Sequence, residues 1–377
     1  MKLLSIFGTR PEAVKMAPIL IALEREPDVQ SRVCVTGQHR LLLDQVLDFF
    51  SITPDFDLDL MAPGQSLNTL VSRAIERLDP ILAAAAPDRV IVQGDTSTAL
   101  AAALAAFHRG IPVAHVEAGL RTYCPGAPFP EENNRRAIAL VADLHFAPTP
   151  AARDNLASER LRGEVHVTGN SGVDALHLVL AVIDADAPFR QRIEEALPRV
   201  DPGRKLLLVT CHRRESFGAP FASIRAALDR LGARADVEIL FPRHPNPELS
   251  GGSAQLPPLD LPSFVALMRR ADLVLTDSGG VQEEAVTLGK PVIVLRDATE
   301  RPEAIGSGAA ILAGTDAGRI VRAVEARLEG AAESAPLCDI YGDGRAAARI
   351  VDALLGRPVE EFAPADPAGR DRLRQIG

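Results

Sequence analysis

Three carboxylic acids each follow a short apolar run in the N-terminal half of the chain. They are Asp95 in Gln-Gly-Asp-Thr, Glu117 in His-Val-Glu-Ala-Gly and Glu131 in Phe-Pro-Glu-Glu-Asn. One acid in such a place is commonly a helix cap, and Asp95 ahead of Thr96 fits that reading. Three acids that converge on one place are typical of proton-transfer chemistry. The run before Glu117 is almost wholly apolar, so we expect partial burial and a raised pKa.

A second group of residues is suited to bind an anion. Ser278, Gly279 and Gly280 follow another apolar run and lead directly into a helical pattern. Exposed N–H groups at the start of a helix favour a phosphate, although an ordinary capped turn has the same pattern. Glu284 is expected on the first turn of this helix, where it accepts ribose hydroxyls or only balances the helix dipole.

Cations accompany both groups. Arg10 and Lys15 come just after the first apolar run, and His212 stands beside Arg213 and Arg214 after a later one. Exposed Arg and Lys are usually solvated charges, and a lone His is more often structural. A histidine with two arginines at a strand end nevertheless favours a contact to a diphosphate.

Composition excludes several classes of protein. A net charge of −9, no tryptophan and 4% aromatic residues disfavour a nucleic-acid binder. The sequence lacks GxGxxG and GxxxxGK[ST], which disfavours a bound nicotinamide cofactor or an ATPase. The missing fingerprints predict that no cofactor is bound. The four cysteines lack CxxC spacing, so we expect no metal site and a reducing, cytoplasmic setting. No apolar run suits a signal or a membrane helix, which predicts a soluble protein without membrane insertion.

Short apolar runs alternate with helical patterns along the chain, which indicates parallel sheets covered on both faces. Strands are expected at 3–7, 32–36, 89–93, 112–116, 144–146, 165–168, 205–210, 237–241, 273–276 and 291–295, with helices at 11–24, 66–85, 97–108, 131–142 and 150–158. The 377 residues suit two domains, an N-terminal one over 1–170 with the acids and a C-terminal one over 171–357. The tail 358–377 is expected to cross back. The fold class is therefore α/β, with two doubly wound Rossmann-like domains facing a cleft.

The ordered set of motifs resembles the non-hydrolysing UDP-N-acetylglucosamine 2-epimerases, which have a glycosyltransferase-B-like fold. The resemblance covers residues 1 to 316. Its motifs are Gly-Thr-Arg-Pro-Glu at 8–12, Gly-Gln-His at 37–39, Gly-Asp-Thr at 94–96, Glu-Ala-Gly-Leu-Arg-Thr at 117–122, Pro-Glu-Glu at 130–132, His-Arg-Arg-Glu at 212–215, Thr-Asp-Ser-Gly-Gly at 276–280 and Arg-Asp-Ala-Thr-Glu-Arg-Pro-Glu at 296–303. Each motif alone is weak, whereas their order is highly specific.

The resemblance implies roles for individual residues. Asp95, Glu117 and Glu131 would form the acid–base group, with His212 assisting at the diphosphate. The residues that would bind UDP and the sugar are Arg10, Lys15, Arg135, Arg213, Phe264, Ser278, Gly279, Gly280, Glu284 and Arg301. Many members are activated by a second UDP-N-acetylglucosamine, and Gln38, Gln65, Arg213 and His244 match part of that site. Gly64 stands where some members place an arginine.

The implied reaction is reversible inversion of C2 between UDP-N-acetylglucosamine and UDP-N-acetylmannosamine. It would proceed by anti elimination of UDP to 2-acetamidoglucal and re-addition, without a cofactor and in a homodimer. Three alternatives stay open at this point: the same chemistry on a related UDP-sugar such as a UDP-2,3-diacetamido-glucuronic acid, a glycosyltransferase of the same fold, and a non-catalytic nucleotide-sugar binding module, which would leave the three acids unexplained. A glycosyltransferase would need an acceptor groove and would not need three acids.

Overall fold

Parallel sheets form the centre of two units of the chain. The computed structural model describes residues 1–37, 40–62, 64–213, 216–243, 255–329 and 339–364. Unit 1 comprises Met1–Ala175 and Tyr341–Pro364, and unit 2 comprises the described part of Leu176–Ile340. The chain therefore leaves unit 1 within one helix and comes back at Tyr341, whereas the sequence placed these points at 170 and 358.

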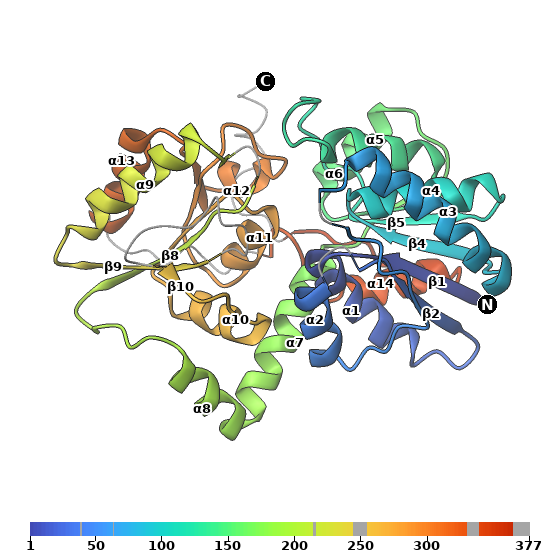
Figure 1. Ribbon diagram of the computed structural model, residues 1–377, viewed down its shortest axis with the longest axis horizontal. Coiled ribbons are helices and arrows are strands. Elements are labelled where there is room, and N and C mark those ends of the chain that lie inside the picture. The colour runs from blue at the N-terminus through green and yellow to red at the C-terminus, as the bar shows by residue number, and fades with distance from the viewer. Residues whose placement is uncertain (38–39, 63, 214–215, 244–254, 330–338, 365–377) are drawn as a thin grey trace. The chain divides into compact units, whose positions relative to one another are not determined.

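Within the described part of unit 1, seven parallel strands lie in the order β3-β2-β1-β4-β5-β6-β7 (Figure 1). The elements are β1 (Lys2–Phe7), α1 (Arg10–Leu23), β2 (Gln30–Val35), α2 (Arg40–Phe49), β3 (Phe56–Asp57), α3 (Leu67–Ala85), β4 (Arg89–Gln93), α4 (Ser97–His108), β5 (Val113–Val116), α5 (Glu131–Val141), β6 (Leu144–Ala147), α6 (Pro150–Ser158), β7 (Glu164–Val167), the start of α7 (Ser171–Ala185), and α14 (Ala346–Leu354). Helix α4 packs between α3 and α5, whereas α1 packs against α2 and α14.

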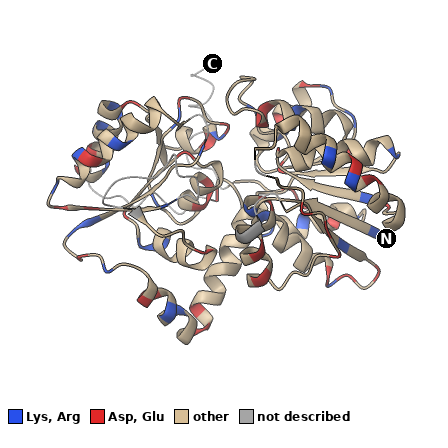
Figure 2. Cartoon of the chain, viewed as in Figure 1, with Lys and Arg blue, Asp and Glu red and all other residues tan. Residues whose placement is uncertain are grey.

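Unit 2 repeats this architecture with six parallel strands among its described residues, in the order β10-β9-β8-β11-β12-β13. After the end of α7 come α8 (Ala187–Ala196), β8 (Lys205–Thr210), α9 (Ala219–Gly232), β9 (Val237–Pro242), β10 (Gln255–Leu256), α10 (Leu261–Arg270), β11 (Leu273–Thr276), α11 (Gly279–Thr287), β12 (Val292–Val294), α12 (Pro302–Gly306), β13 (Ala310–Leu312) and α13 (Ala317–Glu329). Acidic and basic positions are interspersed on its helices, for example on α13 (Figure 2).

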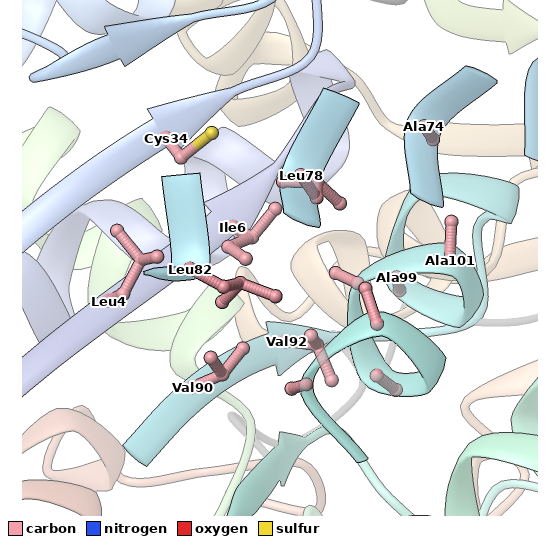
Figure 3. Close-up of a cluster of buried hydrophobic side chains, with 14 of the residues drawn as sticks. Leu4, Ile6, Cys34, Ala74, Leu78, Leu82, Val90, Val92, Ala99 and Ala101 are labelled. Atoms are coloured by element: carbon pink, nitrogen blue, oxygen red, sulfur yellow. The ribbon is translucent and has the colours of Figure 1, made fainter. Parts of the chain in front are cut away.

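The core of unit 1 shows why these runs become strands. Leu4 and Ile6 of β1 and Val90 and Val92 of β4 are fully buried and point at α3 and α4 (Figure 3). A strand covered on both faces needs apolar residues throughout, because no side of it meets water. Helix α4 is rich in alanine, and these small side chains let it lie close to α3 and the sheet.

Side-chain caps determine where several helices begin. Thr9, Thr96 and Thr149 cap α1, α4 and α6, and Asp260 and Ser278 cap α10 and α11. Each oxygen accepts a hydrogen bond from an N–H group that the first helical turn leaves without a partner. The helices therefore start immediately after the strand ends, where the candidate functional residues stand.

The segment that returns to unit 1, Tyr341–Pro364, is bound by buried polar contacts to the end of β7 and the start of α7. Asp174 accepts hydrogen bonds from Ala346 N at 3.2 Å and Ala347 N at 2.8 Å, and so caps α14. Arg349 of α14 donates to Thr168 O at 3.2 Å and forms an ion pair with Asp343 at 2.6 Å. Unit 1 is thus completed by residues from the far end of the chain.

The expected fold class, two doubly wound α/β domains, is confirmed by the two parallel sheets. The expected strands and helices lie within a few residues of observed ones. The pattern did not predict β3, β10 or β13, each of which has only two or three residues. Across the described ranges, no helix is long and apolar enough to span a membrane.

Asp174 gives this architecture a testable pH dependence. Burial raises its pKa to about 6, although the hydrogen bonds from Ala347 and Ala346 lower it in part. The folded protein therefore binds this proton more tightly than the unfolded chain, and stability is lost as the pH rises through about 6. A shift of this size corresponds to roughly 3 kcal/mol at most.

The asparagine of Asp174→Asn cannot ionise, so this variant should lose the pH-dependent part of the unfolding free energy that Asp174 contributes. Urea unfolding of both proteins at several pH values should show that the free energy of unfolding of the variant rises relative to that of wild type as the pH rises from 4 to 7. The variant also loses one hydrogen-bond acceptor, which lowers its unfolding free energy by an amount that does not change with pH. Parallel stability profiles for the two proteins would show that Asp174 does not titrate as described.

Candidate functional site

The strand order of each sheet reverses at one point, and ligands of open parallel sheets bind beyond the carboxyl ends of the strands there. In unit 1 this point lies between β1 and β4, and in unit 2 between β8 and β11. Several of the residues singled out from the sequence stand directly after these strands or after neighbouring β5, namely Asp95, Glu117, His212, Arg213 and Ser278. Each unit therefore presents its own group of candidate residues.

Glu12 joins the loop after β1 to the loop after β4. Its Oε2 accepts hydrogen bonds from Gly8 N at 3.0 Å and Thr9 N at 2.8 Å, and its Oε1 accepts one from the Thr96 hydroxyl at 2.6 Å. Burial raises the pKa of Glu12, and these hydrogen bonds partly oppose that effect. One buried carboxyl group thus holds the two loops together.

Three hydrogen-bond donors surround the carboxylate of Glu117, the residue after β5. Lys15 Nζ of α1 bonds Oε1, Gln93 Nε2 at the end of β4 bonds Oε2 at 2.5 Å, and Asn170 Nδ2 bonds Oε1 at 2.9 Å. The Lys15 and Glu117 side chains are only 10% and 8% exposed, so the expected burial is confirmed. These donors stabilise the carboxylate form and act against the desolvation that burial imposes.

The backbone of Glu117 is also unusual. Its φ of 63° lies in the left-handed region, which costs a residue other than glycine about 1–3 kcal/mol. The surrounding hydrogen bonds hold the residue in this conformation, which aims the carboxylate at Lys15. Strain of this kind is concentrated at functional sites.

Asp95 has a cationic partner of its own. Arg135 Nη2 of α5 donates to Asp95 Oδ2 at 2.5 Å, and Nη1 of the same guanidinium lies 3.4 Å from Glu132. Asn134 Nδ2 donates to the backbone oxygen of Asp95 at 2.9 Å. The cap of α4 is Thr96, so the alternative that Asp95 serves only as that cap is wrong.

The structure brings the elements of all three acids into one region of unit 1. Glu131 is the first residue of α5, one turn before the arginine that bonds Asp95. Gly94 precedes Asp95, and a Cβ at Gly94 would lie 3.4 Å from Glu117 Oε2. His115 Nε2 donates to Gly94 O at 2.7 Å. Burial lowers the pKa of His115 to about 3, so the ring is neutral and holds this turn in place.

In unit 2, the buried carboxylate of Asp277 organises the loop after β8. It accepts hydrogen bonds from His212 N, Arg213 N and the Ser216 hydroxyl, each at 2.9 Å. The ring atom His212 Nδ1 lies 3.4 Å from Asp277 Oδ1. Burial alone would raise the pKa of Asp277, but His212 and these hydrogen bonds outweigh burial and lower it. Asp277 is therefore an anion that orients the half-buried ring of His212.

The first turn of α11 has the geometry of an anion site. Ser278 is its N-cap, with Oγ accepting from Val281 N at 3.5 Å, and Gly279 and Gly280 are its first two residues. The N–H groups of such a turn and the helix dipole attract negative charge. Glu284 lies in the second turn, so its expected place on the first turn is wrong, because the helix begins only at Gly279.

Arg301 lies directly against this turn. A Cβ at Gly279 would come within 2.3 Å of its guanidinium nitrogen Nη1, so only glycine fits there without a shift. Arg301 Nε donates to Glu283 Oε1 at 2.6 Å, and Nη1 bonds Glu300. In this structure, two carboxylates hold the cation that the sequence assigned to UDP.

For the remaining predicted residues, the structure gives a position but no contact that bears on the predicted role. Arg10 is the half-buried first residue of α1, and Phe264 is half-buried on α10. Gln65 Oε1 accepts from Ala62 N at 2.9 Å. Gln38 and His244 lie outside the described residues. Over the part of the chain that the structure describes, no cluster of His, Cys, Asp and Glu is placed to hold a metal ion.

Sequence reasoning gave no role to Glu12, Gln93, Asn170 or Asp277. The spacing Thr9-x-x-Glu12 is the signature of a capping box and could have identified Glu12 as the partner of the loop. Gln93 and Asp277 stand at strand ends beside residues that were chosen. Asn170 carries no such signal, because its partner is 53 residues away in the sequence.

Known proteins resemble this chain over nearly its whole length. A family profile described as UDP-N-acetylglucosamine 2-epimerase matches residues 21–355. The UDP-N-acetylglucosamine 2-epimerase of Escherichia coli strain K12 is 47% identical over 369 residues, covering 94% of this chain and 98% of that protein. The Neisseria meningitidis UDP-GlcNAc 2-epimerase, solved with UDP-GlcNAc bound, is 40% identical with a TM-score of 0.91, covering 95% of this chain and 100% of that one. The Methanocaldococcus jannaschii enzyme, solved with UDP-GlcNAc and UDP, is 32% identical with a TM-score of 0.86, covering 94% and 100%.

The close packing at Gly279 predicts unequal effects of adding a methyl group at two adjacent glycines. Gly279→Ala should destabilise the protein by about 1–3 kcal/mol, since the new methyl meets a guanidinium that two carboxylates hold. Gly280→Ala is the matched control, because its methyl would meet only Glu284 Oε1 at 4.0 Å. Alanine is also favoured over glycine in a helix by roughly 1 kcal/mol. Urea unfolding of both variants tests this, and equal stabilities would refute the packing described.

Proposed function

Because the chain belongs to the UDP-N-acetylglucosamine 2-epimerase family, we propose that it interconverts UDP-N-acetylglucosamine and UDP-N-acetylmannosamine by inverting C2 of the sugar. The observation that carries this proposal is the acid cluster of unit 1. Glu117 and Asp95 follow adjacent strands, each has a buried cationic partner, and Glu131 opens the helix that supplies one of those cations. The two solved relatives with bound UDP-GlcNAc support the choice of substrate.

The chemistry of the sugar explains why acids alone suffice. The hydrogen on C2 is too weakly acidic for direct removal by a carboxylate. Departure of UDP from C1 builds positive charge next to C2 and makes that hydrogen removable. Anti elimination breaks the C1–O and C2–H bonds and gives 2-acetamidoglucal and UDP. Return of UDP to C1 and of a proton to the opposite face of C2 gives the manno epimer, with no net oxidation.

Inversion requires proton carriers on two faces of the sugar. Glu117 is suited to accept the C2 proton, because its donors keep it charged until the proton arrives. Asp95 and Glu131 are the candidates for the opposite face. Lys15 neutralises Glu117 and Arg135 neutralises Asp95, which limits the repulsion between neighbouring carboxylates.

Most of the candidates for binding UDP belong to unit 2, and Arg10 of unit 1 is a further one. The first turn of α11, with Ser278, Gly279 and Gly280, offers N–H donors to the diphosphate. His212, oriented by Asp277, and Arg213 add cationic donors that stabilise UDP as it leaves. The guanidinium of Arg301 packs against Gly279 in this turn, and Glu284 is proposed to accept ribose hydroxyls.

Three further features belong to this proposal. A homodimer and a cytoplasmic location remain predictions. Activation by a second nucleotide sugar also remains a prediction. Of the residues matched to that regulatory site, the structure describes Gln65 and Arg213.

Elimination predicts isotope exchange during turnover. Reaction in D₂O should place deuterium at C2 of the manno product and, as the reaction reverses, in recovered substrate, because carboxylates exchange their protons with water. Cleavage of C1–O should also scramble ¹⁸O between bridging and non-bridging oxygens of the β-phosphate. NMR and mass spectrometry measure both. Product fully protonated at C2 with its bridging ¹⁸O in place would exclude elimination.

Proton carriers and UDP contacts should also separate by mutation. Glu117→Gln should lower kcat by about 100-fold or more while UDP affinity stays within a few fold, because it removes the proton acceptor and leaves the candidate UDP contacts of unit 2 in place. Arg10→Ala should raise the Kd for UDP by about 10- to 100-fold, since a charge-assisted hydrogen bond is lost. Steady-state kinetics and calorimetry with UDP measure the two effects. A Glu117→Gln protein that fails to bind UDP would show that Glu117 is structural.

A further inference from the structure

We propose that Asn170 is a positioning residue that fixes the Glu117 carboxylate to the first turn of α7 and to the returning segment at Tyr341. The inference rests on the proposed function, because it matters for catalysis only if Glu117 exchanges the C2 proton. Asn170 is 2% exposed, and above it serves only as one of the three donors to the Glu117 carboxylate.

The amide of Asn170 is engaged at both ends. Its Nδ2 donates to Glu117 Oε1 at 2.9 Å, and its Oδ1 accepts from Gly172 N at 3.0 Å. An amide nitrogen only donates and its oxygen only accepts, so these partners allow one orientation of the group. The same side chain therefore caps the start of α7 and orients the carboxylate.

The backbone of Asn170 is held as firmly as its side chain. Its N–H donates to Tyr341 O at 2.6 Å, in the segment that returns from the far end of the chain. A Cβ at Gly342 would lie 3.3 Å from Asn170 N and 3.3 Å from Val173 Cβ, so the two chain segments are in close contact. Asn170 cannot shift without displacing this segment.

The three donors to Glu117 differ in what they connect. Lys15 belongs to α1 and Gln93 to β4, and both elements lie wholly in unit 1. Asn170 precedes α7, which begins in unit 1 and from Leu176 onward belongs to unit 2. Of these three bonds, the one from Asn170 is therefore the bond that links the carboxylate to the helix connecting the units. Displacement of the start of α7 would act on Glu117 through it.

Asn170→Ser separates the two roles of the side chain. Serine is a good N-cap but is too short to reach Glu117, so the cap of α7 remains and the donor to the carboxylate is lost. We expect kcat to fall about 10- to 100-fold, as for a misplaced catalytic group, with little change in KM or in the Kd for UDP. Deuterium entry at C2 should slow by the same factor.

Asp186→Ser is the matched control. Asp186 caps α8, its Oδ1 accepts from Phe189 N at 2.9 Å, and it is exposed. The change also replaces one good N-cap by serine, so its shift in melting temperature measures the cost of that exchange. Its kcat should equal that of wild type.

Two more variants keep the inference falsifiable if Asn170→Ser folds poorly. Asn170→Asp keeps size and cap but replaces the donor by a negative charge beside Glu117, and should lose more activity than the serine variant. Gly342→Ala adds a methyl that would lie 3.3 Å from Asn170 N at a backbone φ of 159°, so it displaces the segment that holds Asn170, and should lower kcat without weakening UDP binding.

The outcomes distinguish this inference from the proposed function. Wild-type protein that forms no UDP-N-acetylmannosamine from UDP-N-acetylglucosamine would refute the proposed function. Wild type that turns over normally, together with Asn170→Ser or Asn170→Asp retaining full kcat, would overturn the role of Asn170. A lowered kcat that is matched by Asp186→Ser would assign the effect to helix capping alone.

Discussion

Buried carboxylates join the loops that follow the parallel strands in both units. Parallel strands end side by side, so their loops crowd together with backbone N–H groups that need partners. A carboxylate has enough lone pairs to accept several such donors at once. Glu12 does this between β1 and β4, Asp277 between β8 and β11, and Asp174 between α7 and α14. The precision of the proposed site depends on these interactions.

Buried carboxylates also explain how an acidic protein can present a site for an anion. Arg301 forms ion pairs with Glu283 and Glu300, and its guanidinium packs against the first turn of α11. Helix N–H groups then supply the positive potential locally, without a basic surface. A net charge of −9 is therefore compatible with a diphosphate ligand.

Cationic partners give the acids of unit 1 different surroundings. Glu117 is 8% exposed and receives an ammonium and two amide donors, whereas Asp95 is 26% exposed and receives a guanidinium. Two carboxylates in unlike surroundings are suited to unlike proton-transfer tasks. Asn170 adds a mechanical connection, because it belongs to the start of the helix that leaves the unit.

The sequence by itself determined the fold class, the strand ends and the identity of the family, because hydrophobic pattern, caps and motif order are local properties of the chain. Tertiary structure alone decided which donors meet which acids. The partners of Glu117 lie 102, 24 and 53 residues away along the chain, and no local pattern encodes such pairings. It also decided that Arg301 is neutralised, that Glu284 lies in the second turn of α11, and that unit 1 is completed from Tyr341 onward. These features depend on how segments distant in sequence pack, because the hydrogen bonds of buried polar groups can be satisfied only once the sheets have assembled.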